Sequence, residues 1–476
     1  MSNAADQAPK WRLAPGVYYR LAGEKVYVRN VTTRYDYFFN PMVKDILDLL
    51  KTERTKDELL EELGKTYALK KAPDFGNQLD RVLDSFTQKK LLLVRTATIK
   101  TDPTQDVAGT AKGHFQKNHM LWNVSFELTY LCNERCRHCY LDDPKTNAET
   151  GILRFDVWKK VIDEIADMGC VSALITGGEP TLHPDFSAIC SYLVDRGVFI
   201  DLYTNALDIS EDLFKNIVKI KPNTVSCSLY GGTPAFHDWI TGVPGSFERT
   251  SKTILMFKCA GVDVFIKSVL FKGHAEEYEK LVNWADLSGV PVLCGQTVSN
   301  GRSGRVQSEL NPDPETLRKF FETESKRDPF WNRSSVPPRD LDAPICGIGL
   351  SSFAIRPNGD ISPCIQHPAV LGNVLKDSIQ TIWKTDPLLE SFRKTRFRDV
   401  SPKCATCEHS GFCGVCPGTA FEENGRLSPC SYSCWHAALK HEWFDSRIFS
   451  AAYHDPLPLP DSVESGMHTK STKELT

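Results

Sequence analysis

Three cysteines lie close together in the stretch CNERCRHCY, at Cys132, Cys136 and Cys139. They come directly after NVSFELT (residues 123–129), an apolar run that predicts a buried strand. Three thiolates can hold three corners of a cubane iron–sulfur cluster and leave the fourth iron open to a small molecule. Zinc remains the alternative, with four protein ligands in a structural site or three and a water in a catalytic one. The triplet therefore favours an iron–sulfur cluster with one open iron.

The composition limits the setting in which such a site would work. The chain has 476 residues and 16 cysteines, and its first residues contain no apolar signal segment, so we expect a cytoplasmic protein whose clustered cysteines bind metal. No stretch approaches the ~18 apolar residues of a membrane helix. A net charge of −3 provides no basic field for nucleic acid or a membrane surface. Five isolated cysteines are expected to pack as small apolar side chains, namely Cys170, Cys190, Cys227, Cys259 and Cys294.

Strands and helices alternate between residues 119 and 336. Apolar runs predict six strands, at 123–129, 172–176, 199–204, 224–229, 264–270 and 291–298. Strands separated by helices form parallel βα units with right-handed crossovers, so we expect an α/β core. Ligand sites in such sheets lie at the carboxyl ends of the strands, which is where the cysteine triplet falls.

Four further segments complete the chain. Residues 10–95 predict strands followed by three helices, a small winged-helix-like domain. Residues 96–118 are polar and aperiodic and predict a linker. Residues 337–445 are rich in Cys, Gly and Pro with little apolar periodicity, so metal would have to contribute to their folding energy. Residues 455–476 predict a disordered tail.

A second motif, TGGEP, follows the second predicted strand of the core. Gly177 and Gly178 would allow a ligand to lie against bare backbone, Glu179 could accept from a cationic amine, and Pro180 stiffens the turn. Together, CNERCRHCY and TGGEP resemble the radical S-adenosylmethionine (SAM) superfamily. The resemblance implies a partial (β/α)6 barrel in which the methionine part of SAM chelates the open iron.

The same resemblance implies roles for individual residues. Cys132, Cys136 and Cys139 would hold the cluster. The SAM contacts would come from the glycine turn along the methionine end, with Glu179 near its amine, and from strand ends near the ribose or adenine: Gly177, Gly178, Glu179, Pro180, Thr204, Asn205, Ser226 and Ser228. The four strand-end residues could equally be ordinary polar caps of their strands.

The C-terminal cysteines form a second pattern. They lie in CGIGLSSFAIRPNGDISPC, CATCEHSGFCGVC and PCSYSC, with Gly359 five residues before Cys364. This arrangement resembles the SPASM extension of radical SAM enzymes and implies two auxiliary [4Fe–4S] clusters, three clusters in all. By that resemblance Cys346, Cys364 and Cys416 serve the first, whereas Cys404, Cys407 and Cys413 serve the second with Cys430 or Cys434. One interval departs from the family, C-x2-C in place of C-x3-C, and leaves the allocation of Cys416, Cys430 and Cys434 open. A zinc ribbon is the alternative.

The N-terminal segment resembles the peptide-chaperone domain of pyrroloquinoline quinone synthesis, also called the RiPP recognition element, where RiPPs are ribosomal peptides modified after synthesis. The resemblance rests on YFFNPMVKDILDLL, TKDELLEEL and KKLLLV. It implies that a leader peptide adds to an open strand edge, for which RYDYFF (34–39) is the candidate. TKDELLEELGKTY is too acidic for a DNA recognition helix.

These resemblances imply a radical SAM peptide maturase that takes a hydrogen atom from a ribosomally made precursor peptide and forms a thioether or C–C cross-link. An electron donor such as flavodoxin or ferredoxin would be its partner. Two alternatives stay open: a maturase acting on a residue of a protein partner, as sulfatase-maturing or quinone-cofactor enzymes do, and a non-enzymatic zinc-ribbon interaction protein. The sequence identifies no proton acceptor, although several charged side chains could face the cavity: Asp201, Asp238, Lys267, His274, Arg302 and Arg305.

Overall fold

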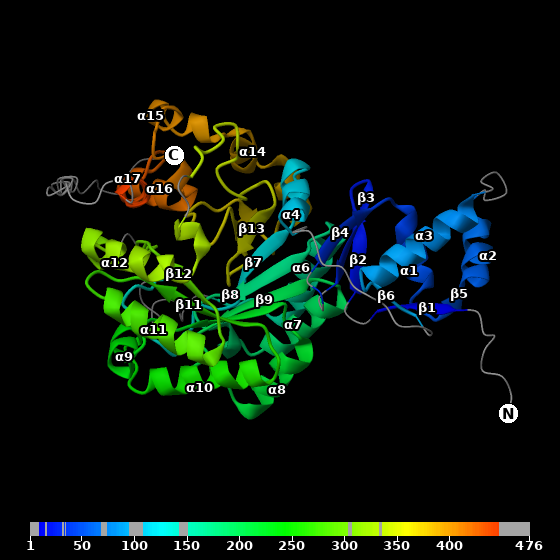
Figure 1. Ribbon diagram of the computed structural model, residues 1–476, viewed down its shortest axis with the longest axis horizontal. Helices are drawn as coiled ribbons and strands as arrows, with labels where there is room; N and C mark the ends of the chain where they lie inside the picture. Colours follow the sequence, from blue (N-terminus) through cyan, green and yellow to red (C-terminus); the bar gives the residue numbers. More distant parts are fainter. Residues whose placement is uncertain are drawn as a thin grey trace.

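The computed structural model describes residues 9–14, 17–30, 33, 35–67, 74–94, 108–141, 151–302, 307–332 and 336–446. The predicted disordered tail lies outside these residues, as does most of the predicted linker. Figure 1 shows three parts: a small N-terminal domain at the right, a central barrel, and the cysteine-rich region at the upper left. No helix among the described residues is both long and apolar enough to cross a membrane.

The central part is a partial barrel of parallel strands. All six predicted strands are confirmed: β7 (Asn123–Glu127), β8 (Ser172–Thr176), β9 (Phe199–Thr204), β10 (Thr224–Ser228), β11 (Val264–Val269) and β12 (Val292–Gly295). They lie side by side in chain order, and each pairs in parallel with its neighbours. The helices between them are α6 (Phe155–Asp167), α7 (Phe186–Asp195), α8 (Glu211–Ile220), α9 (Pro234–Thr241), α10 (Ser246–Cys259) and α11 (Ala275–Ser288).

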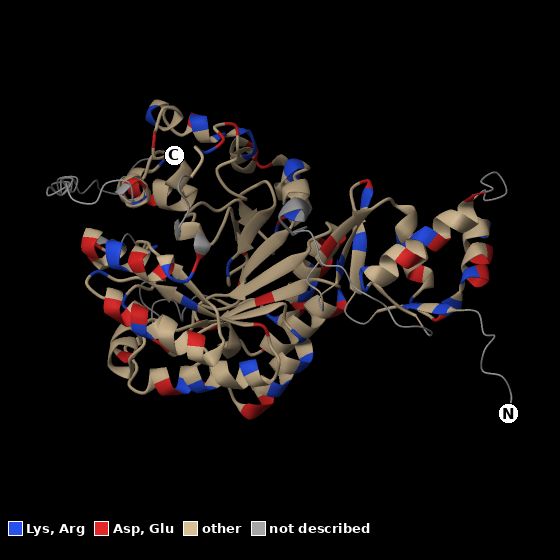
Figure 2. Cartoon of the chain, in the orientation of Figure 1, with Lys and Arg blue, Asp and Glu red and all other residues tan. Residues whose placement is uncertain are grey.

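Alternation along these strands separates the core from the barrel interior. In β8 and β9 the fully buried residues Ala173, Ile175 and Leu202 point to the helices, where they share one core with Trp158 of α6 and Phe257 of α10. Their strand neighbours face the interior and are partly exposed. Charged residues lie mainly on the outer helices, and the strands of the sheet are largely tan in Figure 2. The barrel therefore encloses an accessible lumen.

The cysteine-rich region continues the sheet of the barrel. Its strand β13 (Ser352–Ile355) pairs in parallel with β7, and β14 (Asp360–Ser362) and β15 (Gly372–Asn373) extend the sheet by antiparallel pairing. The helices of this region are α13 (Ile379–Thr385), α14 (Pro387–Lys394), α15 (Pro402–Ala405), α16 (Pro417–Asn424) and α17 (Ser431–Ser446). The sequence had given little sign of this regular structure.

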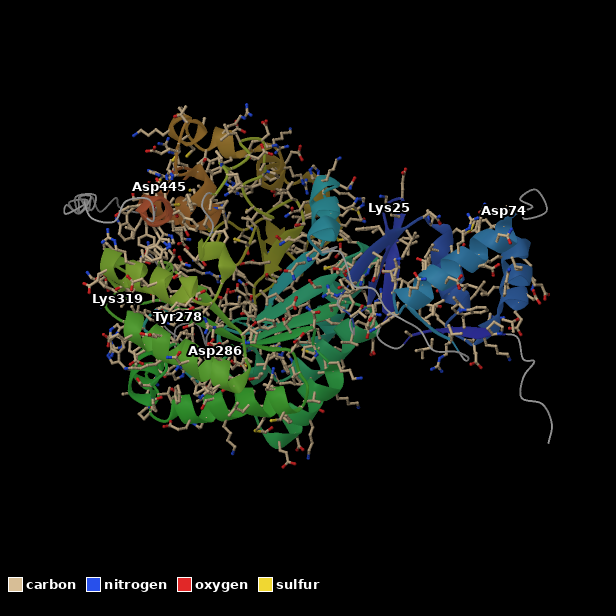
Figure 3. All side chains as sticks on the ribbon, viewed as in Figure 1. Lys25, Asp74, Tyr278, Asp286, Lys319 and Asp445 are labelled. Carbon is tan, nitrogen blue, oxygen red and sulfur yellow. The ribbon has the colours of Figure 1, made fainter. Side chains whose placement is uncertain are left out.

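A further apolar cluster fixes the C-terminal helix against the barrel. Helix α12 (Pro314–Ser325) lies beside α11 and α17, and Tyr278, Lys319 and Asp445 mark these three helices in Figure 3. Phe320 and Phe444 belong to the cluster that they share, and the Tyr278 hydroxyl donates to Glu324 at 2.8 Å. Helix α17 is therefore packed against the barrel through α12 and α11.

In its described residues the N-terminal domain contains two small sheets and three helices. One sheet has the order β2 (Val17–Ala22), β3 (Lys25–Asn30), β4 (Tyr35–Phe39), and the other has the order β5 (Arg54–Thr55), β1 (Lys10–Leu13), β6 (Leu92–Val94). The helices are α1 (Met42–Leu49), α2 (Lys56–Thr66) and α3 (Phe75–Gln88). Thr55 and Glu58 form a capping box at the start of α2. The three predicted helices are confirmed, whereas the winged-helix comparison stays a prediction.

The sheet β2–β3–β4 has two buried faces. Val26 and Val28 pack on the domain's own helices, whereas Tyr27 points the other way and contacts the rings of Phe38, Phe115 and Trp122. Phe115 is fully buried in helix α4 (Ala108–Lys117), a structured part of the segment predicted to be a linker. The polar composition concealed this helix because it is anchored by one large apolar side chain.

Arginines join the same sheet to the barrel. The guanidinium of Arg20 donates to the carbonyl oxygens of Cys170 and Gly197, which follow α6 and α7. Arg29 donates to Asn223 Oδ1 at 2.8 Å and lies over the ring of Phe199. These contacts lie at the amino ends of β8, β9 and β10. The N-terminal domain is therefore docked at the end of the barrel opposite the cysteine triplet.

Candidate functional site

The loop that carries Cys132, Cys136 and Cys139 leaves the carboxyl end of β7 and is anchored by helix α9. The backbone amides of Arg135 and Arg137 donate to the last carbonyls of that helix, at 2.8 and 2.9 Å. These carbonyls have no partner within the helix, so the loop satisfies them while it gains a fixed backbone. The three cysteines therefore lie on a loop whose backbone is fixed by hydrogen bonds, above the lumen of the barrel.

The three thiols are close enough to affect each other's ionisation. Burial, together with Glu179, Glu134 and Cys139, raises the pKa of Cys132 to about 12, although the Glu134 amide donates to its sulfur at 3.4 Å. Burial raises the pKa of Cys136 well above its usual value, and its thiol donates to Glu134 Oε2 at 3.1 Å. Three partly buried thiols on one loop fit the ligand set of a cubane cluster, whose binding replaces their protons.

No three His, Cys, Asp or Glu side chains converge closely enough to hold a single metal ion within the described residues. A cubane makes no such demand, because its cysteines bind separate irons.

The glycine turn after β8 is locked to the cysteine loop. A Cβ on Gly177 would lie 2.3 Å from the carbonyl oxygen of Thr129, and one on Gly178 would lie 2.3 Å from that of Leu131. The Gly178 amide donates to Thr129 and the Glu179 amide to Leu131, both at 2.7 Å. Gly177 also has a φ of +141°. On this face the bare backbone meets the chain's own loop, where the sequence suggested a ligand.

Glu179 is buried and makes four hydrogen bonds within the protein. Its carboxylate accepts from the amide and hydroxyl of Thr181, from the Thr204 hydroxyl at 2.9 Å and from the Asn205 amide at 2.7 Å. Burial raises its pKa, and these donors oppose the rise. The carboxylate therefore ties the end of β8, where Pro180 begins a short 3-10 turn, to the end of β9.

The strand-end residues fall at two levels of the barrel. Asn205 reaches the cysteine loop, because its side-chain amide donates to Asn133 Oδ1 at 2.6 Å and lies 3.9 Å from the Cys132 sulfur. Ser228 is hydrogen-bonded to Tyr230, a partly buried residue whose pKa is raised by desolvation and then by Cys136. Ser226 lies lower and lines the lumen. The structure thus gathers Thr204, Asn205 and Ser228 around the loop, with Ser226 deeper.

A buried ion pair beside the triplet was missed by the sequence interpretation. Glu127, fully buried at the end of β7, accepts from Arg302 at 2.9 and 3.0 Å and from the Tyr140 hydroxyl at 2.7 Å. Arg302 also donates to the carbonyl of Ile365, the residue after Cys364. The pair connects the triplet loop to the C-terminal cysteines. An acidic residue within an apolar strand was the signal that could have revealed it.

The other charged residues that the sequence suggested for the cavity differ in where they lie. Asp238 accepts from Gly245, Ser246 and Phe247 and so begins helix α10. His274 packs on the ring of Phe236. Asp201 and Lys267 line the lumen. Arg305 lies outside the described residues.

The eight C-terminal cysteines fall into two groups of four. Cys416 lies close enough to raise the pKa of three other thiols, those of Cys346, Cys364 and Cys430. The Cys430 thiol also donates to the carbonyl oxygen of Cys416 at 3.9 Å. In the same way Cys434 and Cys407 raise the pKa of both Cys413 and Cys404. The two groups are Cys346, Cys364, Cys416 and Cys430, and Cys404, Cys407, Cys413 and Cys434. Each offers the four thiolates that a closed cubane requires.

Packing supports the two groups. Gly418, two residues after Cys416, lies against Gln366, two residues after Cys364, and a Cβ on the glycine would lie 2.8 Å from that side chain. In the other group Cys404 and Cys413 contribute to one apolar cluster with Phe397. The fold thus brings together cysteines that are far apart in the sequence.

Two family models match the sequence. The model of the radical SAM superfamily matches residues 126–285, and that of the SPASM iron–sulfur cluster-binding domain matches residues 346–408. Both matches fall within the segments predicted for these parts. They imply SAM and [4Fe–4S] clusters, and they set aside the zinc-ribbon alternative.

Curated relatives match about two thirds of the chain. The antilisterial bacteriocin subtilosin biosynthesis protein AlbA of Bacillus subtilis is 28% identical over 320 residues, 65% of this chain and 71% of AlbA. The AdoMet-dependent heme synthase of Methanosarcina barkeri is 28% identical over 328 residues, 63% and 93% of the two chains. The mycofactocin maturase MftC of Mycobacterium tuberculosis is 28% identical over 313 residues, 63% and 78%.

One solved structure shares the fold over most of the chain. Streptococcus suis SuiB bound to the precursor peptide SuiA superposes with a TM-score of 0.61 at 18% identity, and the match covers 89% of this chain and 99% of SuiB.

Proposed function

We propose that this chain, an enzyme with a radical SAM domain and a SPASM domain, modifies a ribosomally made precursor peptide and forms a thioether or C–C cross-link within it. Two relatives carry names of peptide chemistry, a bacteriocin biosynthesis protein and a maturase. The observation that carries the proposal is the placement of three parts on one barrel. An open lumen has the cysteine triplet at one end and two sets of four cysteines at its side. At its other end lies a domain in which, among the described residues, the outer edge of one sheet is unpaired.

The triplet and the turn behind it would prepare the radical. Cys132, Cys136 and Cys139 would hold a [4Fe–4S] cluster, and SAM bound there supplies, once reduced, a 5′-deoxyadenosyl radical that takes a hydrogen atom from the substrate. The Gly177–Pro180 turn fixes the loop from behind. The remaining SAM contacts would come from polar groups at the ends of the next two strands, Thr204, Asn205, Ser226 and Ser228.

Forming a cross-link removes two hydrogens from the peptide. The first leaves as an atom, and the second leaves as a proton and an electron, so the site needs an electron acceptor. The C-terminal cysteines would hold two auxiliary [4Fe–4S] clusters that can take that electron. Arg302 lies where the triplet loop and the Cys364 loop meet, and its cationic group would hold them together. A flavodoxin- or ferredoxin-like donor would supply the electron that starts the reaction.

The N-terminal sheet would capture the leader of the precursor. β4 ends the sheet β2–β3–β4, and within the described residues no strand pairs with its outer edge. A peptide that adds there gains main-chain hydrogen bonds that depend little on its side chains. Tyr37 packs with the domain's own helices, whereas Phe38 packs on α4. A bound leader would therefore lie next to the seam between this domain and the barrel.

Leader capture is testable with proline. Tyr37→Pro in the full chain is expected to weaken binding of the encoded leader about tenfold or more, because proline removes a main-chain donor from the edge. Tyr37→Ala, which keeps the amide, should have a smaller effect. Binding is measured by fluorescence anisotropy of a labelled leader. The full chain is required because the domain alone would expose the apolar face around Tyr27.

Phe38→Pro is the control for the other phase of the strand. Amides of an edge strand alternate in direction, so only one of the two prolines should act on leader binding alone, and the other should lower thermal stability. If both variants and the parent bind the leader equally, or if none of them binds it, leader capture by this edge is wrong. The barrel chemistry would be unaffected by that result.

A further inference from the structure

The lumen of the barrel contains a cavity of mixed polar and apolar lining, most of which the proposed radical chemistry leaves without a role. It measures about 470 Å³, within the range of small-molecule and side-chain pockets. Inward-facing residues of several strands line it, among them Asp201, Tyr203, Thr224, Ser226 and Lys267. Lys112 of α4 and Ser351 add to its wall. The cavity is thus a hydroxyl-rich space with charged groups inside the barrel.

Lys267 is the feature of this cavity that calls for a ligand. It belongs to β11, and its ammonium lies 5.0 Å from the centre of the Tyr203 ring, which holds it by a cation–π contact. Among the described residues no carboxylate forms an ion pair with it. A lysine partly withdrawn from water keeps its charge at lowest cost when an anion is close.

Asp201 shares the cavity but is held elsewhere. Its Oδ1 accepts from the Asn223 side-chain amide at 2.7 Å and from the Thr224 hydroxyl at 2.8 Å. Asn223 in turn accepts from Arg29 of the N-terminal sheet at 2.8 Å. This chain of hydrogen bonds fixes the aspartate at the amino end of β9. The lysine therefore remains available to a carboxylate from outside the protein.

The position of Lys267 relates it to the reaction centre. Lys267 pairs in the sheet with Ser228, and Ser228 is hydrogen-bonded to Tyr230, which lies close to Cys136. The lysine thus stands on the lumen wall on the side of the cysteine loop. A side chain bound to it would place its neighbours in the peptide beneath that loop.

We propose that Lys267 binds a carboxylate of the peptide substrate and so selects a sequence in which an acidic group lies beside the modified residue. The shared chemistry is a carboxylate, from a Glu or Asp side chain or from a peptide C-terminus. The inference rests on the proposed peptide substrate and adds the class of residue that is recognised.

The test uses full-length, cluster-loaded enzyme and three short peptides. Acetyl-Gly-Gly-Glu-Gly-Gly-amide carries an internal carboxylate, its Gln counterpart carries none, and the Gln peptide with a free C-terminus carries only the terminal one. Affinities are measured by saturation-transfer NMR. The parent enzyme should bind at least one carboxylate peptide about tenfold more tightly than the neutral one, as expected for a charged hydrogen bond. The tighter of the two identifies the source.

Substitutions assign that preference to the lysine. Lys267→Met should abolish it, Lys267→Arg should retain most of it, and Lys252→Met, on the exposed face of α10, should leave it unchanged. Equal binding of all three peptides by the parent enzyme would overturn the inference, and so would a preference that survives in Lys267→Met. If Lys267→Met does not fold, the comparison of peptides on the parent and on Lys267→Arg still decides. Formation of 5′-deoxyadenosine by the same samples tests the radical chemistry separately.

Discussion

Cys136→Ala should abolish formation of 5′-deoxyadenosine from SAM while the protein stays folded. Two thiolates cannot retain the cluster in a state that binds SAM, so about four of roughly twelve irons should be lost after anaerobic reconstitution. The rest of the loop is held by backbone bonds from Arg135 and Arg137 to α9, which the substitution leaves in place. Iron content and chromatographic detection of 5′-deoxyadenosine measure the two effects.

Cys259→Ala is the matched control for this variant. Cys259 is an exposed cysteine at the end of α10, outside each of the three groups. The Cys259→Ala variant should retain both the iron content and the formation of 5′-deoxyadenosine. Normal SAM cleavage by Cys136→Ala would remove the triplet from the mechanism.

Cys430→Ala and Cys434→Ala should damage different clusters, although the two cysteines are one helical turn apart. The amide of Cys434 donates to the carbonyl of Cys430 at 3.0 Å, yet Cys430 is buried beside Cys416 and Cys434 is exposed beside Cys407. We expect Cys430→Ala to open or release the first auxiliary cluster and Cys434→Ala the second. Each should lower the iron content by up to about four.

The signals of the two variants in electron paramagnetic resonance should therefore differ from each other and from the parent. A Cys430→Ala variant with the spectrum and iron content of the parent would show that this cysteine is no ligand. With Cys430 in place the first auxiliary cluster would be closed by protein. A cluster of that kind fits an electron acceptor better than a site that binds a substrate thiol.

The barrel could be predicted closely because its strands have local signatures. SALIT, FIDLYT and TVSCSL are short, β-rich runs between amphipathic helices, and each lies within one residue of an observed strand. The cysteine triplet and the glycine turn were likewise readable, since each combines an unusual residue with a strand end. The structure added the reason for the glycines, which is the close approach of Thr129 and Leu131.

Contacts between distant segments could not be predicted in this way. Arg20 of β2 and Arg29 of β3 dock the N-terminal sheet on the barrel, and nothing in the sequence around them indicates those contacts. The ion pair of Glu127 and Arg302 joins residues 175 positions apart. The spacing of the C-terminal cysteines left Cys416, Cys430 and Cys434 undivided, because only the folded chain places Cys430 next to Cys416. Tertiary position decides such pairs, and a single sequence does not encode it locally.

The most direct measurement is the mass of a precursor peptide after reaction. The cluster-loaded full chain is incubated anaerobically with SAM, a reductant and the peptide encoded by a short open reading frame beside its gene. The account predicts a product roughly 2 Da lighter, the mass of two hydrogens, and about one 5′-deoxyadenosine per cross-link. A peptide of unchanged mass, with 5′-deoxyadenosine forming at the same rate whether or not the peptide is present, would contradict it.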